Sequence, residues 1–287
     1  MTINVQRLLD WRIPDAHQEY DERDCILYAL GLGFGSDPLD LRQLRHVYER
    51  DLEAFPSLLL VLAAGPRWAS DPATGIDYAK VVHAEQSFTL NRPIPVRARV
   101  RSSSKVTGVV DKGAGRGAIV SSERTLFFDD EREPAALLTS GLFCRGDGGC
   151  GSGGGSSIPS VPRPKAPDGQ PDATVSLVIQ PHLALLYRLS GDMNPLHADP
   201  AVAAAAGFRA PILHGLSSFG LALRAAIEGA DLAPASLTGA GVRFTGPVYP
   251  GETIETDIWR QDGRLAFRSR IPARDALVLD HGWINHD

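Results

Sequence analysis

An acid, an amide and an imidazole lie together on one short segment of the chain. Asp192, Asn194 and His197 surround Pro195, whose ring removes a backbone N–H and fixes φ, which predicts an irregular loop. General acid–base chemistry needs an acid and a base at a fixed separation, and histidine exchanges protons near neutral pH. Aspartate and asparagine also form ordinary turns, so the loop alone leaves both interpretations open.

A short helix with clear ends follows this loop. Asp199 is the expected N-cap, Pro200 the first helical residue and Gly207 the residue after the last turn. Helix boundaries of this kind hold the preceding loop in place.

A second helix is predicted from Gly215 to about Glu228. Gly215 falls in its first turn, where backbone N–H groups lack partners and the helix dipole is positive. Because glycine has no side chain, an oxygen can approach that N–H closely. The Gly215 N–H is therefore expected to stabilise a developing enolate oxygen, although a glycine required only for close packing is equally consistent with the sequence.

Taken in order, these segments resemble the MaoC-like hydratases, and more narrowly the (R)-specific 2-enoyl-CoA hydratase 2 branch. Met193 departs from the tryptophan that is frequent there, and Ala84 from a frequent glycine. The first half resembles the N-terminal half of the same branch. The resemblance is carried by the segments Tyr187–His197, Gly207–Phe208, Pro211–Gly215 and Arg243–Gly251, and in the first half by Tyr28–Gly33 and His83–Phe88.

A Gly/Ser/Pro-rich linker over residues 144–172 is expected to separate two domains, 1–143 and 173–287. The two look alike: Leu27–Leu30 matches Leu186–Leu189, and the same offset places Gly33 opposite Asp192 and Pro38 opposite His197. The first copy lacks both proton-transferring groups. We therefore expect one site per chain, in the second domain, with the first domain supplying an acyl-chain pocket.

Each half is predicted to be an α+β unit with one long buried helix and several antiparallel strands. In the first half, Phe55–Leu60 is expected to open that helix. The resemblance implies a double hot-dog fold, with two antiparallel sheets each wrapped round a long central helix.

Composition limits the partners. A net charge of −5 over 287 residues gives no basic face for nucleic acid. Cys25, Cys144 and Cys150 form neither a disulfide framework nor a metal-ligand pattern, which favours a reducing compartment. With no signal segment, membrane-spanning run or Ser-Lys-Leu terminus, a cytoplasmic protein is expected.

The resemblance implies a hydro-lyase that adds water reversibly to trans-2-enoyl-CoA and gives (3R)-3-hydroxyacyl-CoA in fatty-acid or related acyl-CoA metabolism, bulky sterol side chains included. The CoA thioester is the substrate, no cofactor or metal is expected, and a homodimer is expected by family similarity. Asp192 and His197 would share one water, with Asp192 favoured as base and His197 as acid. Asn194 would orient Asp192 or the water, or serve only as a turn residue.

Other side chains are expected to bind the substrate or to support the site. Arg209 and Arg243 are candidates for CoA phosphates because guanidinium binds phosphate in a bidentate way. His214 is expected near the substrate, bonded to neighbouring loops. His83, Glu85 and Gln86 are expected to brace the interface between the halves.

Three other functions remain open because the fold does not select the reaction. They are a hot-dog acyl-CoA thioesterase, a 3-hydroxyacyl dehydratase and a non-catalytic acyl-CoA-binding subunit.

Overall fold

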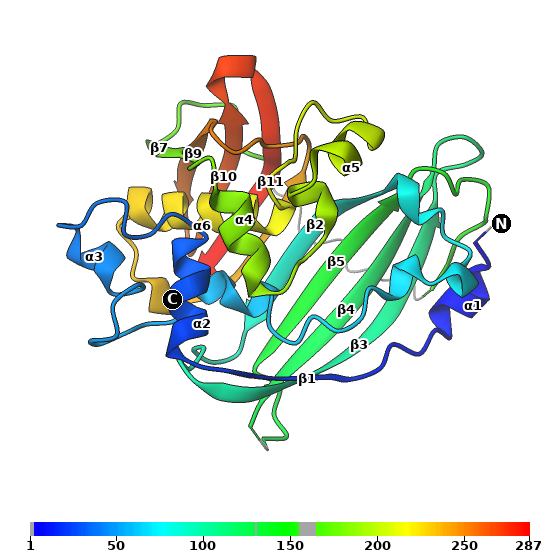
Figure 1. The fold of residues 1–287 in the computed structure, drawn as a ribbon, viewed down its shortest axis with the longest axis horizontal. Coiled ribbons are helices and arrows are strands. Elements are labelled where there is room, and N and C mark those ends of the chain that lie inside the picture. The colour runs from blue at the N-terminus through cyan, green and yellow to red at the C-terminus, as the bar shows by residue number, and fades with distance from the viewer. Residues whose placement is uncertain (1–2, 130, 155–164) are drawn as a thin grey trace.

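Strands from both halves of the chain form one continuous antiparallel sheet (Figure 1). The computed structural model describes residues 3–129, 131–154 and 165–287. The strand order is β1-β3-β4-β5-β2-β8-β11-β10-β9-β7, and β6 pairs with β3. The strands are β1 (Ala16–Tyr20), β2 (Val81–Leu90), β3 (Ala98–Asp111), β4 (Ala118–Phe128), β5 (Ala136–Cys144), β6 (Gly153–Gly154), β7 (Ala173–Val178), β8 (Leu237–Phe244), β9 (Thr253–Gln261), β10 (Arg264–Ile271) and β11 (Ala276–His286).

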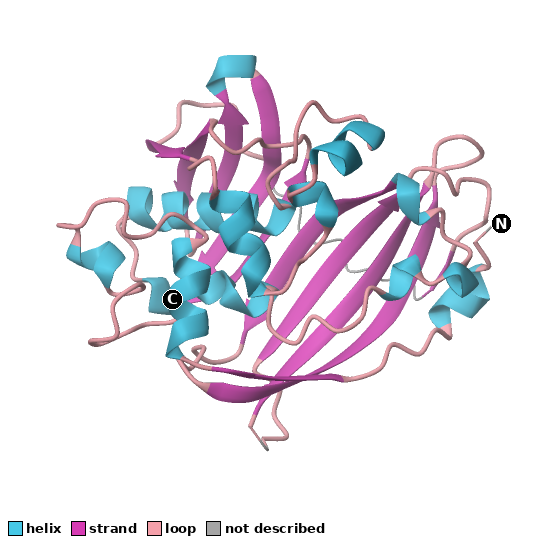
Figure 2. Ribbon diagram, viewed as in Figure 1, coloured by secondary structure: helices cyan, strands magenta, loops and turns pink. Residues whose placement is uncertain are grey.

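Most helical segments lie on one side of this sheet (Figure 2). The α-helices are α1 (Val5–Leu9), α2 (Glu22–Leu30), α3 (Leu41–Leu44), α4 (Leu183–Tyr187), α5 (Pro200–Ala205) and α6 (Gly215–Ala230). Short 3-10 helices are η1 (Pro56–Leu60), η2 (Trp68–Ser70), η3 (Pro72–Thr74), η4 (Tyr78–Lys80), η5 (Arg188–Ser190), η6 (Pro195–His197), η7 (Pro234–Ser236) and η8 (Pro272–Arg274).

The two halves join where β2 pairs with β8. The register runs from Glu85 opposite Arg243 to Thr89 opposite Gly239, so Glu85 and Gln86 lie at the interface, as predicted. The α+β class and the double hot-dog architecture are confirmed. The expected two sheets are fused into one, because this pairing satisfies the backbone groups of both edge strands.

The second half holds the predicted long helix, α6, whose side chains are buried along most of its length. It ends at Ala230, after which Asp231 takes a left-handed conformation with φ 52°. It packs against β7, β9 and β10. A helix apolar on most sides must be surrounded by protein, and the curved sheet surrounds it.

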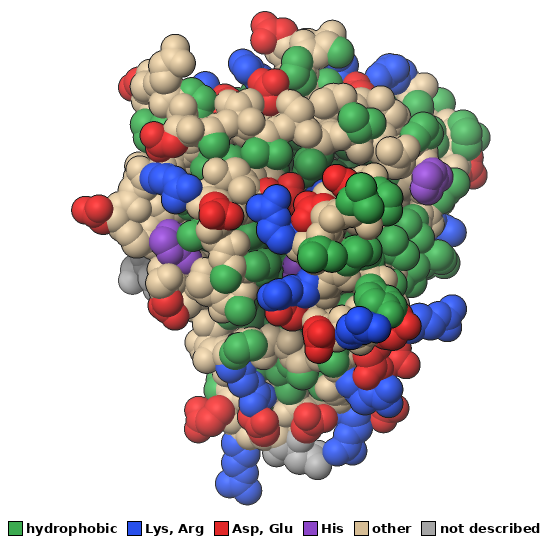
Figure 3. All heavy atoms as spheres, turned by 90° about the vertical axis from the view of Figure 1, so that its left-hand side faces the viewer, with side chains coloured by type: hydrophobic (Ala, Val, Ile, Leu, Met, Phe, Trp, Pro, Cys, Tyr) green, Lys and Arg blue, Asp and Glu red, His purple; other side chains and the backbone are tan. Residues whose placement is uncertain are grey.

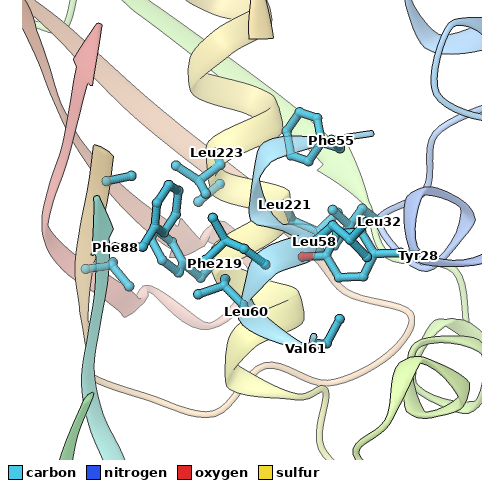
Figure 4. Close-up of a cluster of buried hydrophobic side chains, with 14 of the residues drawn as sticks. Tyr28, Leu32, Phe55, Leu58, Leu60, Val61, Phe88, Phe219, Leu221 and Leu223 are labelled. Carbon is cyan, nitrogen blue, oxygen red and sulfur yellow. The ribbon is translucent and has the colours of Figure 1, made fainter. Parts of the chain in front are cut away.

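The prediction of a long helix in the first half is wrong. Pro56–Leu60 forms only the short 3-10 helix η1. Ala63 and Gly65 then take positive φ values of 43° and 71°, and Pro66 disfavours helical geometry at the residue before it. Figure 4 shows Leu58 and Leu60 beside Leu221 and Phe219 of α6, and Phe55 belongs to the same buried cluster. Apolar burial therefore holds this segment in place although it does not form a long helix.

The start of the predicted linker is docked on the first half. Gly153 and Gly154 pair with β3, and the Asp111 carboxylate accepts N–H bonds from Gly149 and Gly151 at 2.8 and 2.9 Å. Residues 155–164 of that linker lie outside the described residues.

Arg224 of α6 ties the second half to the loop after α2. Its side chain is 3% exposed, its Nη1 donates to the Leu32 carbonyl at 3.1 Å and its Nε to Glu228 at 2.8 Å. We expect Arg224→Met to lower the free energy of unfolding by about 2–3 kcal/mol, because it leaves a buried carbonyl and a carboxylate without their donor.

Urea denaturation measures this change, with Arg42→Gln as the control, since that side chain is 72% exposed. The control should change stability by less than about 0.5 kcal/mol. An equally small effect of Arg224→Met would show that the halves associate without this contact.

Candidate active site

The Asp192–His197 loop is built from successive side-chain turns. The Asn194 N–H donates to Asp192 Oδ1, and the Leu196 N–H donates to Asn194 Oδ1, both at 3.1 Å. Asn194 thereby caps η6, which ends at His197. These local bonds hold the acid and the imidazole on opposite ends of one tight turn.

The predicted helix after the loop is present. The Asp199 side chain accepts N–H bonds from Ala201 and Val202, Pro200 is the first residue of α5, and Gly207 follows the helix with φ 85°.

Three polar side chains meet at this loop. One ligand-type atom from each of Asp192, His197 and His214 lies within 4.8 Å of the others. The rings of His197 and His214 stack with centroids 3.7 Å apart and planes inclined by 27°. His214 directly precedes α6, so the loop and the long helix together form the cluster.

His197 is nearly buried, and its protonation follows from one contact. Its Nδ1 lies 2.8 Å from the Ile212 carbonyl, which only accepts, so Nδ1 carries the hydrogen. Burial lowers the pKa of His197 below its usual value, which keeps the ring neutral at pH 7. Nε2 therefore holds a free lone pair. This tautomer favours His197 as the proton acceptor when hydration starts, whereas the sequence favoured it as the acid.

His214 is held in the same neutral state. Burial lowers its pKa to about 4, and the neighbouring His197 adds to the shift. Its Nε2 donates to the backbone carbonyl of Asp192 at 3.1 Å. The contact is with the loop backbone, so His214 fixes the position of Asp192.

An acid and two histidines are also a donor set that metal ions bind. The lone pairs of imidazole lie in the ring plane, and two nearly parallel stacked rings direct them side by side rather than toward one point. The geometry thus favours proton transfer over coordination by both rings.

Gly215 begins α6, as predicted, and its N–H makes no hydrogen bond within the described part of the chain. The first N–H of the helix to bond a backbone carbonyl is that of Ser218, which donates to His214 at 3.0 Å. A Cβ on Gly215 would lie 3.3 Å from the Phe244 ring, so glycine is also favoured by close packing. The free N–H is available to an anionic oxygen.

The first half contributes a histidine that the sequence assigned only to the interface. Ala84 is the extra residue of a bulge in β2, which turns His83 to the same sheet face as Gln86. The His83 ring lies 4.9 Å from Phe244, its Nε2 is 3.0 Å from Ser140 Oγ, and the Asp192 charge acts on its pKa. Burial nevertheless lowers the pKa of His83 to about 4. The alternating pattern of β2 did not predict that His83 faces the site, because the bulge at Ala84 reverses the faces of the residues before it.

A groove of about 380 Å³ ends beside the catalytic loop. Its walls come from both halves, including Leu58 and Val61–Gly65 on one side and Leu189–Gly191 on the other. A Cβ on Gly191 would lie 3.8 Å from the Val61 carbonyl, so the segment after η1 runs close to the loop.

The two predicted phosphate-binding arginines lie in different places. Arg209 stacks on Tyr249 at 4.1 Å and donates to Glu252, which Arg274 also contacts. Arg243 lies on the sheet face opposite to Phe244 and Val242, which border the core and the site. The structure therefore does not bring Arg243 to this site.

No helix among the described residues has the length and apolarity to cross a membrane. Acidic and basic side chains are interspersed on the face shown in Figure 3, without a large patch of one sign.

The fold and the site define a double hot-dog protein with one acid–base cluster. Residues 163–277 match the model of the MaoC like domain, and residues 18–146 match that of the MFE-2 hydratase 2 N-terminal domain. The chain belongs to the MaoC-like family, and its two halves match the hydratase 2 arrangement within it.

Relatives and solved structures agree with this assignment. The chain is 36% identical to the enoyl-CoA hydratase ChsH3 of Mycobacterium tuberculosis over 98% of both chains. It is 33% identical to the peroxisomal enoyl-CoA hydratase 2 of Arabidopsis thaliana, over 96% of this chain and 93% of that one. A MaoC-like dehydratase from Phytophthora capsici superimposes with TM-score 0.85 at 34% identity, over 99% of both chains.

The buried neutral histidines predict acid sensitivity. The folded pKa values of His83 and His214 are about 4, below the value of about 6.5 expected in the unfolded chain. Between these values the unfolded chain binds more protons, so the free energy of unfolding falls as pH drops from 6.5 toward 4. The slope reaches at most roughly 1.4 kcal/mol per pH unit for each histidine.

Urea titrations across this range measure the slope. His83→Gln should make it shallower, whereas the exposed His17→Gln should leave it unchanged. An unchanged slope in His83→Gln would contradict the depressed pKa.

Proposed function

We propose that this enoyl-CoA hydratase of the hydratase 2 type produces (3R)-3-hydroxyacyl-CoA by the action of Asp192 and His197 on one water molecule. The observation that carries the proposal is the cluster of Asp192, His197 and His214 beside the free N–H of Gly215. The same machinery in reverse is a dehydratase, because the reaction is reversible.

Hydration begins at the β-carbon, which is electrophilic because the thioester carbonyl withdraws electrons. The water oxygen bonds to the β-carbon while Nε2 of His197 takes one water proton. The electrons of the double bond move toward the carbonyl oxygen, and the Gly215 N–H stabilises the resulting enolate. The Asp192 carboxylate accepts a hydrogen bond from the second water hydrogen, which stays on the oxygen and becomes the product hydroxyl, and its negative charge stabilises the imidazolium.

The second step restores the enzyme. The enolate electrons form the α-carbon–hydrogen bond with the proton on His197 Nε2, and the ring returns to its neutral tautomer. One water supplies both the hydroxyl and the proton. Since one imidazole makes both transfers, the two groups add to the same face of the double bond.

The first half provides the acyl-chain wall in this proposal. It lacks the long central helix, and its segment Val61–Gly65, which runs close to Gly191 at the start of the loop, forms that wall. The homodimer and the cytoplasmic location remain predictions, and size-exclusion chromatography with light scattering tests the first.

A thioesterase would direct water to the carbonyl carbon and release free thiol, and a non-catalytic binder would change neither signal. Purified protein mixed with trans-2-enoyl-CoA should lose the absorbance of the conjugated thioester without releasing thiol, and EDTA should leave the rate unchanged. Chiral analysis of the product tests the (R) configuration. Thiol release would contradict the proposal.

Asp192→Asn and His197→Gln should each lower kcat by at least about 100-fold, because each removes a group that handles the water proton. Steady-state absorbance assays measure the loss. Asp231→Asn and His182→Gln are matched controls at exposed positions and should keep the wild-type rate. Wild-type activity in Asp192→Asn would remove that residue from the mechanism.

The pH profile distinguishes the two roles of His197. Its pKa lies below the usual 6.5, so kcat/KM should hold from pH 8 to about 6.5 and fall at lower pH as Nε2 becomes protonated. Stopped-flow hydration in buffers of constant ionic strength measures the profile. Activity that rises as pH falls from 7 to 5 would show that protonated His197 starts the reaction as the acid.

A further inference from the structure

The strands of the first half are apolar at both ends and polar in the middle on the face that borders the site. One apolar cluster includes Val100 and Leu126, and a separate one includes Val106 and Val120. Between the two clusters lies a set of polar side chains, here called the polar band: Gln86, Ser102, Ser104, Ser122, Arg124 and Ser140.

The sheet register places these side chains side by side. Ser104 lies opposite Arg124, and Ser122 lies opposite Ser140, which in turn lies opposite Gln86. Residues two apart on a strand share a face, so Ser122 and Arg124 point the same way.

The segment after η1 runs over the polar band. Ser102 Oγ donates to the Ala63 carbonyl at 2.7 Å, and Arg124 Nη2 donates to the Leu60 carbonyl at 2.7 Å. Ser104, Ser122 and Ser140 still retain partial exposure beneath it. These three hydroxyls are therefore only partly covered by protein.

Arg124 is a cation without a counter-ion. Within the described residues no carboxylate pairs with it, and its bonds go from Nη2 to the carbonyls of Leu59 and Leu60. Burial lowers its pKa to about 10, so it stays charged at neutral pH. The interior Arg224 differs, because Glu228 pairs with it. A guanidinium has five N–H donors, and the half-buried Arg124 uses only those of Nη2 in these bonds.

The polar band begins beside His83, on which the charge of the catalytic loop acts. Ser140 Oγ contacts His83, whose pKa the Asp192 charge affects. Ser140 and Arg124 lie on neighbouring strands and two residues apart along them, which places their Cα atoms about 8 Å from each other. An acyl chain whose thioester lies at Asp192 can extend along the band toward Arg124.

We propose that Arg124 is a specificity-determining residue that binds a carboxylate at the far end of the acyl chain, so that ω-carboxy-2-enoyl-CoA thioesters are preferred substrates. The inference rests on the proposed function and on the acyl chain lying under the segment after η1. The guanidinium can donate two parallel hydrogen bonds to such a carboxylate, and the serine hydroxyls can donate further hydrogen bonds to it. A CoA phosphate offers the same anionic chemistry but is common to every substrate.

The test compares pairs of trans-2-enoyl-CoA thioesters of several lengths, each as the ω-carboxylate and as its methyl ester. The wild type should show higher kcat/KM for the carboxylate at the length that reaches Arg124. Arg124→Gln keeps a donor for the Leu60 carbonyl and should lower kcat/KM for the carboxylate about tenfold or more, mainly through KM. For the ester the change should stay within about threefold.

Lys105→Gln is the matched control. Lys105 is a neighbour of Ser104 on β3 but lies on the opposite face, 71% exposed and paired with Glu123. The Lys105→Gln substitution also removes one positive charge close to Arg124, and it should leave the preference for the ω-carboxylate over the methyl ester unchanged. Arg124→Lys should restore part of the preference, because the charge returns without the planar fork.

Several outcomes overturn the proposal. Equal loss on carboxylate and ester would assign Arg124 to structure or to the CoA phosphates. A wild type that hydrates both members of every pair equally would overturn it even if the variants fail to fold. If the wild type hydrates nothing, the proposed function fails separately. In that case, calorimetric titration of the wild type and Arg124→Gln with the saturated ω-carboxyacyl-CoA and with its methyl ester tests whether Arg124 binds the carboxylate.

Discussion

β2 and β8 pair antiparallel at the centre of the sheet, and the enclosure of the site by both halves depends on that pairing. It brings His83 of the first half beside Phe244 of the second, and Phe244 in turn lies against the helix start at Gly215. The hydrogen bonds of the ladder fix this alignment, because a slip of one residue would move these side chains to the other face. A site made by one half is thus enclosed by both.

Burial determines the chemistry of the site more than any single charge does. His83, His197 and His214 are all kept neutral by desolvation, and two of them bond to backbone carbonyls that select the tautomer. Neutral rings at low exposure keep their lone pairs directed and exclude competing water. The same burial lowers the free energy of unfolding at acidic pH, because the unfolded chain binds protons at these histidines more readily than the folded chain does.

The first half diverged in structure as well as in its catalytic residues. Tyr28 and Tyr187, matched by the internal repeat, still lie side by side with ring centroids 5.7 Å apart. The helix expected after Phe55 is reduced to η1, and the chain beyond it covers strands whose middle is polar. Arg124 gives this polar middle a positive charge that a simple hydrocarbon chain would not satisfy.

The sequence alone determined what depends on near neighbours along the chain. Pro195 and Asn194 specify the loop, Asp199 and Gly207 the helix ends, and the glycine before an apolar run the start of α6, because turn and cap geometry is set by a few adjacent residues. Only the tertiary structure decided the approach of His83 through the bulge at Ala84, the tautomer of His197 and the unpaired state of Arg124. Each of these depends on contacts between residues far apart in sequence, which local propensity does not encode.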